Sequence, residues 1–400
     1  MKIGIYGGTF DPIHKGHMAA AKTAAAKLKL DKLLLIPAGL PPHKSLALGG
    51  ASGNDRLEMA RIAADRLRLK IPVEVLDIEL NREGKSYTSD TLKELKKQYP
   101  KDELWLLMGT DMFLSLHQWH EPEVILSLAN ICAFGRAEQD SKEVLAPQKK
   151  HLSKISKAKI TTLVLPNLVE TSSTALREQL AKGERPEELD ESIYGYILRR
   201  QLYGTHADLT HLNWDDLRAC SYSMIRSKRI PHVRGCEEEA VKLAQRWGAD
   251  EDVARAAAIL HDCTKYLKLD EQLSLCAKYG IILDDLEKVS VKLLHSKTGS
   301  AIARYEYGMP EIVYDAIFWH TTGKPDMTLM EKILYIADYM EPTRDFDGVE
   351  KLRELVYKDL DAAVLLGLEM SVEDIASQGN PVHKNTQEAL DFLRKEYSNG

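Results

Sequence analysis

The sequence predicts an α/β domain with a parallel sheet, followed by an all-helical domain. In the first half, short apolar runs alternate with helical segments, as in a parallel sheet covered by helices on both faces. From Asn213 onward no strand pattern appears, and apolar residues recur at helical spacing, as at Leu329, Ile333 and Ile336. The chain has 400 residues, which is too long for one ordinary core and favours two domains.

Six segments of the first half have the pattern of strands, and helical segments lie between and after them. The expected strands are residues 2–6, 33–36, 73–80, 103–108, 131–134 and 162–165. The expected helices are residues 18–28, 56–69, 89–98 and 192–200. Ligands of parallel sheets bind at the carboxyl ends of the strands, so polar residues that directly follow strands are candidate site residues.

A break shortly after residue 200 separates the two halves. Tyr203-Gly204 interrupts the helical pattern, and only helical patterns follow it. We therefore expect a first domain at residues 1–203, a linker at 204–210 and a second domain at 211–400.

Composition and charge exclude several classes of protein. With 44% hydrophobic and 28% charged residues, the chain has the composition of a globular protein, and its net charge of −6 argues against a nucleic-acid-binding surface. Its five cysteines form no CxxC pair, which is typical of reduced thiols, and no apolar run approaches the ~20 residues of a membrane span. We expect a cytoplasmic protein without nucleic-acid or membrane partners, and a homo-oligomer is compatible with this sequence.

The most informative stretch is residues 7–17, Gly-Gly-Thr-Phe-Asp-Pro-Ile-His-Lys-Gly-His, between the first strand and the first helix. Gly7 and Gly8 allow a sharp turn and close approach to a ligand, and the N–H groups that open the following helix attract phosphate. His14 and His17 are three residues apart and therefore lie on one face of that helix. The stretch predicts a phosphate-binding turn in which two histidines serve a reaction at phosphorus.

This stretch resembles the (T/H)xGH signature of the nucleotidyltransferase superfamily, with residues 14–17 as HxGH. Members of the superfamily join a nucleoside triphosphate to a phosphate-bearing acceptor and release pyrophosphate. The resemblance implies a Rossmann-like domain in which His14 and His17 contact the triphosphate. They would stabilise charge on the α-phosphate and on the departing pyrophosphate.

Further pieces of the first half look like the nicotinate-nucleotide adenylyltransferase family over approximately residues 1–203. These pieces are Pro41-Pro42-His43-Lys44, Ser86-Tyr87-Thr88, Gly109-Thr110-Asp111 with Trp119, and Ser172-Ser173-Thr174 with Arg177. The family implies that ATP, as its Mg²⁺ complex, is bound by Gly7, Gly8, Thr9, Phe10, His14, His17, Lys44, Ser173, Thr174 and Arg177. The expected catalytic residues among them are His14, His17, Lys44 and Arg177.

The same resemblance implies an acceptor site for nicotinate mononucleotide. Asp111, Trp119 and the backbone near Thr88 and His120 would hold it, because an indole can stack on a pyridine ring and N–H donors suit a carboxylate. The main rival is a pantetheine-phosphate adenylyltransferase. That family ordinarily has Thr in place of His14 and lacks the segment around Trp119.

Polar residues in the second half form a constellation. Each lies beside apolar residues, so each is expected to face the interior: His232, His261, Asp262, His295, His320 and Asp338. Buried polar groups are costly without partners, and a metal cluster would supply the partners.

The order His, His-Asp, Asp resembles the HD phosphohydrolase superfamily, which implies an all-α HD-domain helical bundle. The four signature metal ligands would be His232, His261, Asp262 and Asp338. The additional His295 and His320 imply a second metal, with Asp262 able to bridge the two. Imidazole and carboxylate ligands together suit two divalent ions such as iron or manganese, which activate water and hold phosphate oxygens.

Residues 320–323 and 337–344 resemble the YqeK-like branch of that superfamily, and the resemblance covers about residues 207–400. Its members split diadenosine tetraphosphate symmetrically into two ADP. Asp262 and Lys265 are then expected to be catalytic, and Lys265 and Arg344 to contact the phosphates. Two alternatives stay open for this half. One is a different HD phosphohydrolase, such as a nucleotidase or a cyclic-nucleotide phosphodiesterase, and the other is an adenylate-sensing regulatory module.

Overall fold

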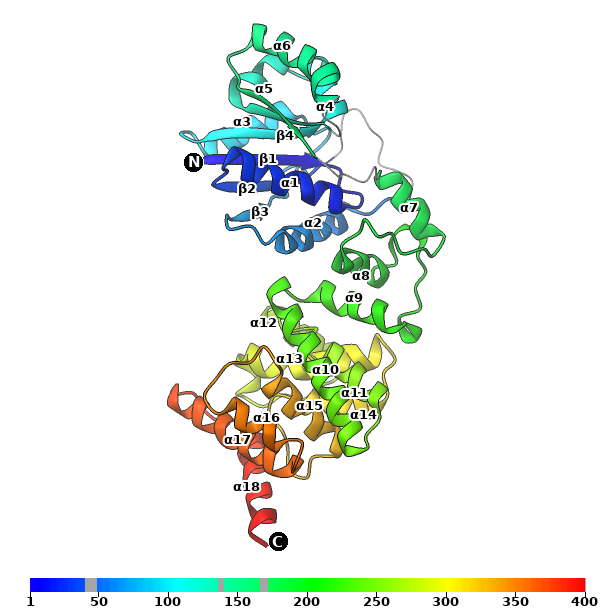
Figure 1. The fold of residues 1–400 in the computed structure, drawn as a ribbon, viewed down its shortest axis with the longest axis vertical. Coiled ribbons are helices and arrows are strands. Elements are labelled where there is room, and N and C mark those ends of the chain that lie inside the picture. The colour runs from blue at the N-terminus through cyan, green and yellow to red at the C-terminus, as the bar shows by residue number, and fades with distance from the viewer. Residues whose placement is uncertain (40–48, 136–139, 166–171, 400) are drawn as a thin grey trace. The chain divides into compact units, whose positions relative to one another are not determined.

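The computed structural model describes residues 1–39, 49–135, 140–165 and 172–399. The chain divides into two compact units, Met1–His206 and Ala207–Gly400 (Figure 1). The first unit has a parallel sheet with helices, and the second is helical throughout its described part. The fold class predicted from the sequence is therefore confirmed.

The first unit is built on a six-stranded parallel sheet in the order β3-β2-β1-β4-β5-β6. The strands are β1 (Lys2–Gly8), β2 (Lys32–Pro37), β3 (Val73–Val75), β4 (Glu103–Gly109), β5 (Asn130–Gly135) and β6 (Ile160–Val164). The chain builds outward from β1 in one direction through β2 and β3, and in the other through β4 to β6. The strand order therefore reverses between β1 and β4, which is the place where such sheets bind ligands.

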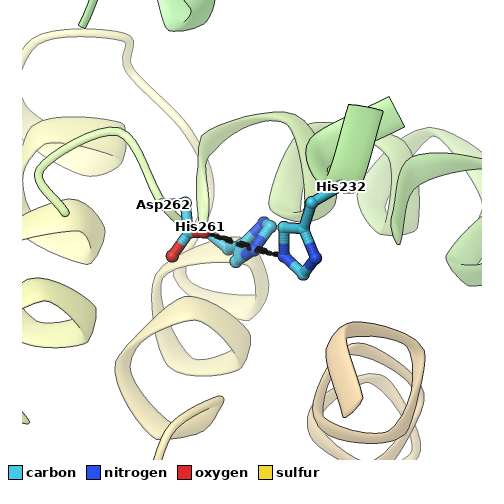
Figure 2. Close-up of side chains that lie close together, drawn as sticks. All are labelled: His232, His261 and Asp262. Atoms are coloured by element: carbon cyan, nitrogen blue, oxygen red, sulfur yellow. Dashed lines mark hydrogen bonds and ion pairs between the residues drawn. The ribbon is translucent and has the colours of Figure 1, made fainter. Parts of the chain in front are cut away.

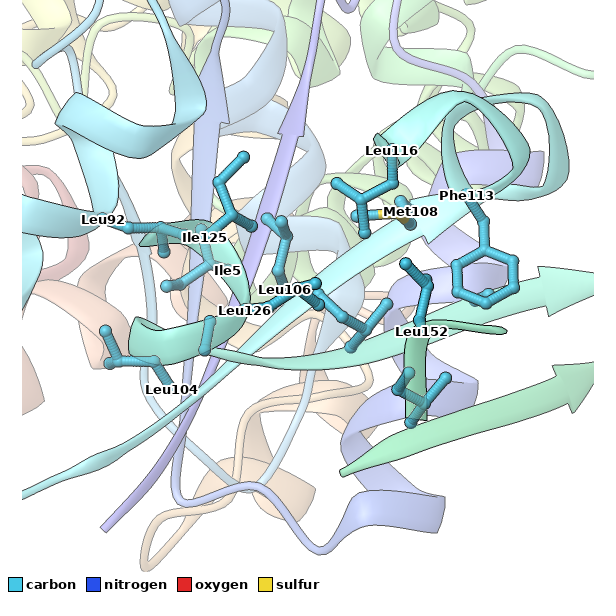
Figure 3. Packing of buried hydrophobic residues seen from close by; sticks show 14 of the residues in the cluster. Ile5, Leu92, Leu104, Leu106, Met108, Phe113, Leu116, Ile125, Leu126 and Leu152 are labelled. Atoms are coloured by element: carbon cyan, nitrogen blue, oxygen red, sulfur yellow. The ribbon is translucent and has the colours of Figure 1, made fainter. Parts of the chain in front are cut away.

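Helices cover both faces of this sheet. The helices of this unit are α1 (Lys15–Leu28), α2 (Gly53–Leu67), α3 (Thr88–Gln98), α4 (Thr110–Ser115), α5 (Pro122–Leu128), α6 (Ala146–Ile155), α7 (Ser173–Ala181) and α8 (Glu191–Arg199). Because side chains alternate along a strand, Ile5 and Leu106 lie on one face and pack against Leu92 of α3 and Ile125 of α5 (Figure 3). Helices α1 and α2 pack on β1 and β2 from the other face.

One predicted strand extends too far. β3 ends at Val75, whereas the alternating pattern predicted a strand to residue 80. Leu76 and Ile78 lie beyond the strand and pack against the core as partly buried side chains. The alternating pattern therefore predicted the contacts of Leu76 and Ile78 with the core, but not where the strand ends.

The second unit has no strand among its described residues 207–399. Its helices are α9 (Trp214–Met224), α10 (Ile230–Trp247), α11 (Glu251–Leu260), α12 (Leu269–Lys278), α13 (Val291–Tyr305), α14 (Glu311–Trp319), α15 (Leu329–Met340), α16 (Val349–Leu355), α17 (Leu360–Ser377) and α18 (Lys384–Asn399). Helices α10, α11, α13, α14 and α15 pack against one another and supply the polar constellation.

Local sequence fixes where these helices begin and end. Pro231 lies in the first turn of α10, and Gly248 ends this helix with a φ of 75°. In α15, Thr328 and Glu331 form a reciprocal capping box.

No helix in the described part of the chain is both long and apolar enough to cross a membrane. All five cysteines are buried, and none forms a disulfide.

Candidate active sites

The two histidines of the turn after β1 meet at the start of α1. His14 caps the helix, and its Nδ1 accepts a hydrogen bond from the Gly16 N–H at 3.2 Å. The Nδ1 of His17 accepts from the backbone N–H of His14 at 3.3 Å, and the two ring centroids are 3.8 Å apart. A neutral imidazole carries one hydrogen, so with Nδ1 accepting, that hydrogen is on Nε2 in both rings. The pair therefore supplies two Nε2–H donors.

Burial keeps this pair neutral. It lowers the pKa of His14 to about 4, and it lowers the pKa of His17 well below the ordinary value of 6.5, with a smaller effect from His14. Gly16 is required by the packing, because a Cβ there would lie 2.9 Å from Cε1 and Nδ1 of His14. The site can act on a phosphate through neutral hydrogen-bond donors and the N-terminus of α1.

Arg56 of α2 holds the backbone of this turn, although it was not among the residues predicted for the site. Its side chain is buried, and Nη1 donates to Thr9 O at 2.8 Å and to Ala38 O at 2.7 Å. The loops after β1 and β2 are therefore tied to one guanidinium. Gly8 adds a steric constraint, since a Cβ there would lie 2.8 Å from the Phe10 ring.

Helix α7 brings three of the expected ATP residues to the same turn. Arg177 Nη1 donates to Asp11 O at 2.6 Å, and Ser173 Oγ donates to Pro12 O at 3.2 Å. Arg177 Nη2 also donates to Thr174 Oγ1 at 3.2 Å. Segments that are far apart in the sequence thus converge on the carboxyl end of β1.

The other residues that were expected to bind ATP or the acceptor in this half differ in their surroundings. Phe10 has a buried side chain, packed on the rings of Tyr6 and His17. Asp111 lies exposed in the first turn of α4. Lys44 lies outside the described residues, and Gly7 and Gly8 end β1.

Residues expected to hold the acceptor lie around α3 and α5. Thr88 opens α3, and its neighbour Tyr87 packs on His120 with ring centroids 4.4 Å apart. Trp119 packs against the core and donates from Nε1 to Ser115 Oγ at 3.2 Å. One edge of the indole is therefore already held in place.

Tyr203, which the sequence marked only as a break, binds the turn after β1. Its hydroxyl donates to Oδ1 of Asp11 at 2.7 Å, and that carboxylate also accepts from Ala51 N–H at 3.0 Å. Tyr203 reaches it from a left-handed backbone conformation with a φ of 58°. Asp11 is 4% exposed, so its oxygens depend on these protein donors.

We expect Tyr203→Phe to destabilise the first unit by about 1–3 kcal/mol, because a buried carboxylate oxygen loses a donor. In a domain of this size, each kcal/mol lowers Tm by roughly 2–4 °C. Calorimetric unfolding of the full chain measures the shift. An unchanged Tm of the first unit would show that the hydroxyl contributes nothing.

The second unit brings all six residues of the polar constellation together. His232 lies in the first turn of α10, His261 and Asp262 directly follow α11, His295 lies in α13, His320 follows α14 and Asp338 lies in the last turn of α15. Figure 2 shows three of these side chains, which converge from α10 and the end of α11.

The distances define two histidine pairs that share Asp262. The Nε2 atoms of His232 and His261 are 3.2 Å apart, and those of His295 and His320 are 3.1 Å apart. Asp262 Oδ2 lies 3.4 Å from His261 Nε2, and its Oδ1 lies 3.2 Å from His295 Nε2. Asp338 Oδ1 is 2.9 Å from His232 Nε2. The carboxylate of Asp262 therefore faces one pair with each oxygen.

Hydrogen bonds on the far side of each ring orient the histidines toward this centre. In every case Nδ1 lies within 2.6–2.9 Å of an oxygen and donates to it: Ala258 O for His261, Lys292 O for His295, Ile317 O for His320 and Glu341 Oε1 for His232. A ring that donates from Nδ1 and carries no second proton directs its Nε2 lone pair at the centre.

These residues fit divalent metal ions. Burial is the main cause that lowers the pKa of His295 and of His320, so both rings are neutral and no proton separates their Nε2 atoms. Lone pairs that face one another beside carboxylates need cations between them. Three triads have ligand atoms within 4.8 Å of one another: His232, His261 and Asp262; His261, His320 and Asp338; Asp262, His295 and His320.

Positive side chains surround the carboxylates. Lys265 Nζ lies 3.2 Å from both Asp262 Oδ1 and His295 Nε2, and Arg344 Nη2 donates to Asp338 Oδ1 at 2.9 Å. Arg229, which the sequence analysis did not assign, donates from Nε to Asp262 Oδ2. In the sequence, the one indication that Arg229 belongs to this site was its position three residues before His232.

A second group of histidine and carboxylates, at Asp284, Glu287 and His383, has the opposite arrangement. His383 Nδ1 accepts from Asn385 N–H at 3.2 Å, so its Nε2–H donates to Asp284 Oδ2 at 2.9 Å. Glu287 pairs with Lys297 Nζ at 2.8 Å. Because no imidazole lone pair faces the carboxylates, this group is a set of ion pairs and hydrogen bonds that needs no metal.

Comparisons with known proteins match each half of the chain to a different family. Residues 5–179 match the family model described as cytidylyltransferase-like, and residues 229–343 match the HD domain model. The chain therefore joins a nucleotidyltransferase-type domain to an HD domain.

Its relatives place the first half more closely. A probable nicotinate-nucleotide adenylyltransferase from Shewanella sp. (strain ANA-3) is 38% identical over 217 residues, covering 51% of this chain and 99% of that protein. One from Dictyoglomus thermophilum is 40% identical over 205 residues, covering 51% and 100%. Through its first half, the chain belongs to the nicotinate-nucleotide adenylyltransferase family.

Among solved structures, a predicted HD superfamily hydrolase involved in NAD metabolism from Clostridium acetobutylicum is similar to part of the chain. It is 35% identical, covers 46% of this chain and 98% of its own, and has a TM-score of 0.45.

Proposed function

We propose that the first half transfers AMP from ATP to nicotinate mononucleotide, giving deamido-NAD and pyrophosphate. The observation that carries this proposal is the neutral His14–His17 pair at the start of α1, with an Nε2–H donor on each ring. Its relatives from Shewanella and Dictyoglomus, which carry the name of that activity, support the choice of acceptor.

The proposed reaction is a direct displacement at phosphorus. A phosphate oxygen of the acceptor forms a bond to the α-phosphorus of Mg²⁺-bound ATP, and the bond from that phosphorus to pyrophosphate breaks. The two Nε2–H groups donate to oxygens on which charge increases during this step. Arg177 adds a fixed cation beside the turn, and Lys44 is assigned to the same role on the sequence resemblance alone.

The acceptor is assigned to the region between α3 and α5. Trp119 would stack on the pyridine ring, and backbone donors near Thr88 and His120 would bind its carboxylate. Asp111, exposed after β4, would accept from ribose hydroxyls. Selectivity against nicotinamide mononucleotide follows, because backbone N–H groups suit the carboxylate of nicotinate better than the amide nitrogen of nicotinamide.

Pyrophosphate release from the purified full chain tests this assignment. With Mg²⁺ and ATP, we expect nicotinate mononucleotide to be used at least tenfold better, in kcat/KM, than nicotinamide mononucleotide. Equal use of the two would contradict the carboxylate-binding role. Turnover with pantetheine phosphate alone would replace the proposal by the rival family.

We further propose that the second half hydrolyses diadenosine tetraphosphate symmetrically to two ADP at a two-metal centre. His232, His261 and Asp262 would hold one ion, with Asp338, and Asp262, His295 and His320 the other. Two such ions supply activated water and charge neutralisation at phosphate oxygens. Lys265 and Arg344, now paired with Asp262 and Asp338, would move to phosphate oxygens when substrate binds.

The products decide between the candidates for this half. Incubation of the full chain with diadenosine tetraphosphate and Fe²⁺ or Mn²⁺ should give ADP alone. AMP with ATP would contradict symmetric cleavage. Turnover of a mononucleotide or a cyclic nucleotide instead would favour a different HD phosphohydrolase, and binding of an adenylate without turnover would favour a regulatory module.

We also place both reactions in the cytoplasm. This part of the proposal is supported by the five buried cysteines, none of which forms a disulfide, as is usual in a reducing compartment.

A further inference from the structure

His232 differs from the other three histidines of the candidate metal centre. Those three donate from Nδ1 to neutral backbone carbonyls, whereas His232 donates to the Glu341 carboxylate at 2.9 Å. We propose that Glu341 is a positioning residue, which fixes His232 and strengthens the metal position that His232 serves. The inference rests on the metal centre of the proposed function and on no particular substrate.

Glu341 is held in place from several sides. Its side chain is fully buried, directly after the last turn of α15 that carries Asp338. Oε2 accepts from Thr343 N–H at 2.7 Å, and Oε1 accepts from the Thr343 hydroxyl as well as from His232. Arg353 Nη2 donates to the Glu341 backbone carbonyl at 2.8 Å. The carboxylate therefore cannot turn away from His232 without losing other bonds.

Helix α10 leaves space for this carboxylate. Gly235 lies three residues after His232, on the same face of the helix. A Cβ at this glycine would lie 2.4 Å from Glu341 Oε2, which is closer than packing allows. A glycine inside a helix costs about 1 kcal/mol relative to alanine. Here that cost is matched by room for the carboxylate that His232 contacts.

The charge of the group that accepts the hydrogen bond from His232 Nδ1 affects metal binding. A carboxylate bonded to Nδ1–H raises the electron density of the imidazole more than a neutral carbonyl does, and thereby strengthens its bond to a cation. The position served by His232 should therefore bind a divalent ion more tightly than the position served by His295 and His320. Loss of such an outer partner typically weakens metal affinity by about 10–100-fold.

Titration of the metal-stripped full chain with Mn²⁺ tests this, with free Mn²⁺ measured by electron paramagnetic resonance. The wild type should bind two ions. Glu341→Gln should weaken the tighter of them by about 10–100-fold and change the other by less than about threefold. Equal affinities of Glu341→Gln and the wild type would overturn the proposal.

The matched control is Glu331→Gln, which removes a buried carboxylate from the first turn of α15. Glu331 accepts from Thr328 N–H at 2.7 Å and pairs with Lys324, so it should not affect Mn²⁺ affinity. Equal losses of Mn²⁺ affinity in both variants would show that Glu341 has only a structural role, and would contradict the proposal.

A milder variant tests the proposal in case the Glu341→Gln protein does not fold. Thr343 is exposed, and Thr343→Val removes one hydroxyl donor from Glu341. We expect about fivefold weaker binding at the same position, and no change there would contradict the proposal. If the wild type binds two ions yet hydrolyses no dinucleotide, only the substrate assignment fails. If it binds no Mn²⁺, the metal centre and the role of Glu341 fail together.

Discussion

Asp262→Asn should reduce hydrolysis by the second half far more than the roughly 10–100-fold that loss of an outer partner costs. Asp262 is fully buried and faces a histidine pair with each of its oxygens, so one substitution affects both proposed metal positions. An amide also offers no negative charge to two cations. Metal content and ADP formation, measured on the same preparation, should fall together.

Asp284→Asn is the matched control for this prediction. It changes an aspartate that also contacts a histidine, in the group where His383 donates from Nε2. We expect wild-type metal content and hydrolysis. If Asp262→Asn retains both metals and full activity, the shared-carboxylate assignment is wrong.

His17→Ala should lower kcat of the adenylyl transfer by about 10²–10³, the usual effect of removing one donor to a developing oxyanion. The KM for the acceptor should change little, because the acceptor is assigned to the region of Trp119. His151→Ala is the control, since His151 is exposed on α6. A loss in KM alone, with kcat unchanged, would contradict a role in the transition state.

The pH profile of the same reaction should lack a histidine step near 6.5. Burial lowers the pKa of His14 to about 4, and His17 is lowered well below its ordinary value. Both rings therefore stay neutral as the pH falls from about 8 to 6, and His14 becomes protonated only as the pH approaches 4. A step in kcat near pH 6.5 that is absent from His14→Gln and His17→Gln would show that the rings titrate normally.

The sequence predicted those parts of the molecule that depend on neighbouring residues. Gly7, Gly8, His14 and His17 lie within one strand-turn-helix unit, so the glycine positions and histidine spacing predicted its shape directly. In the second half, each polar residue of the constellation lies beside an apolar run, which predicted its burial. The distances between these residues could not be predicted, because they come from five helices.

Partners that are distant in the sequence escaped prediction. Asp11 binds Tyr203, and His232 binds Glu341. One sequence contains no record of which distant positions meet. Arg56 escaped for a related reason, because an arginine within a helix ordinarily reaches solvent, and here two loops enclose it.

One exposed helix was also missed. No helix was expected over residues 146–155, where α6 lies. Leu152 is the one residue of α6 assigned as buried, so a helix that contacts the core at a single apolar side chain has almost no periodic signal.

Because its ligands come from five helices, the proposed metal centre also reports on folding. No single helix holds enough donors to keep an ion, so ions should bind only after the bundle has assembled, and they should stabilise it. Loss of one helix contact would then release cations as well as loosen the core. Chelation should lower the melting temperature of the second unit and leave that of the first unchanged.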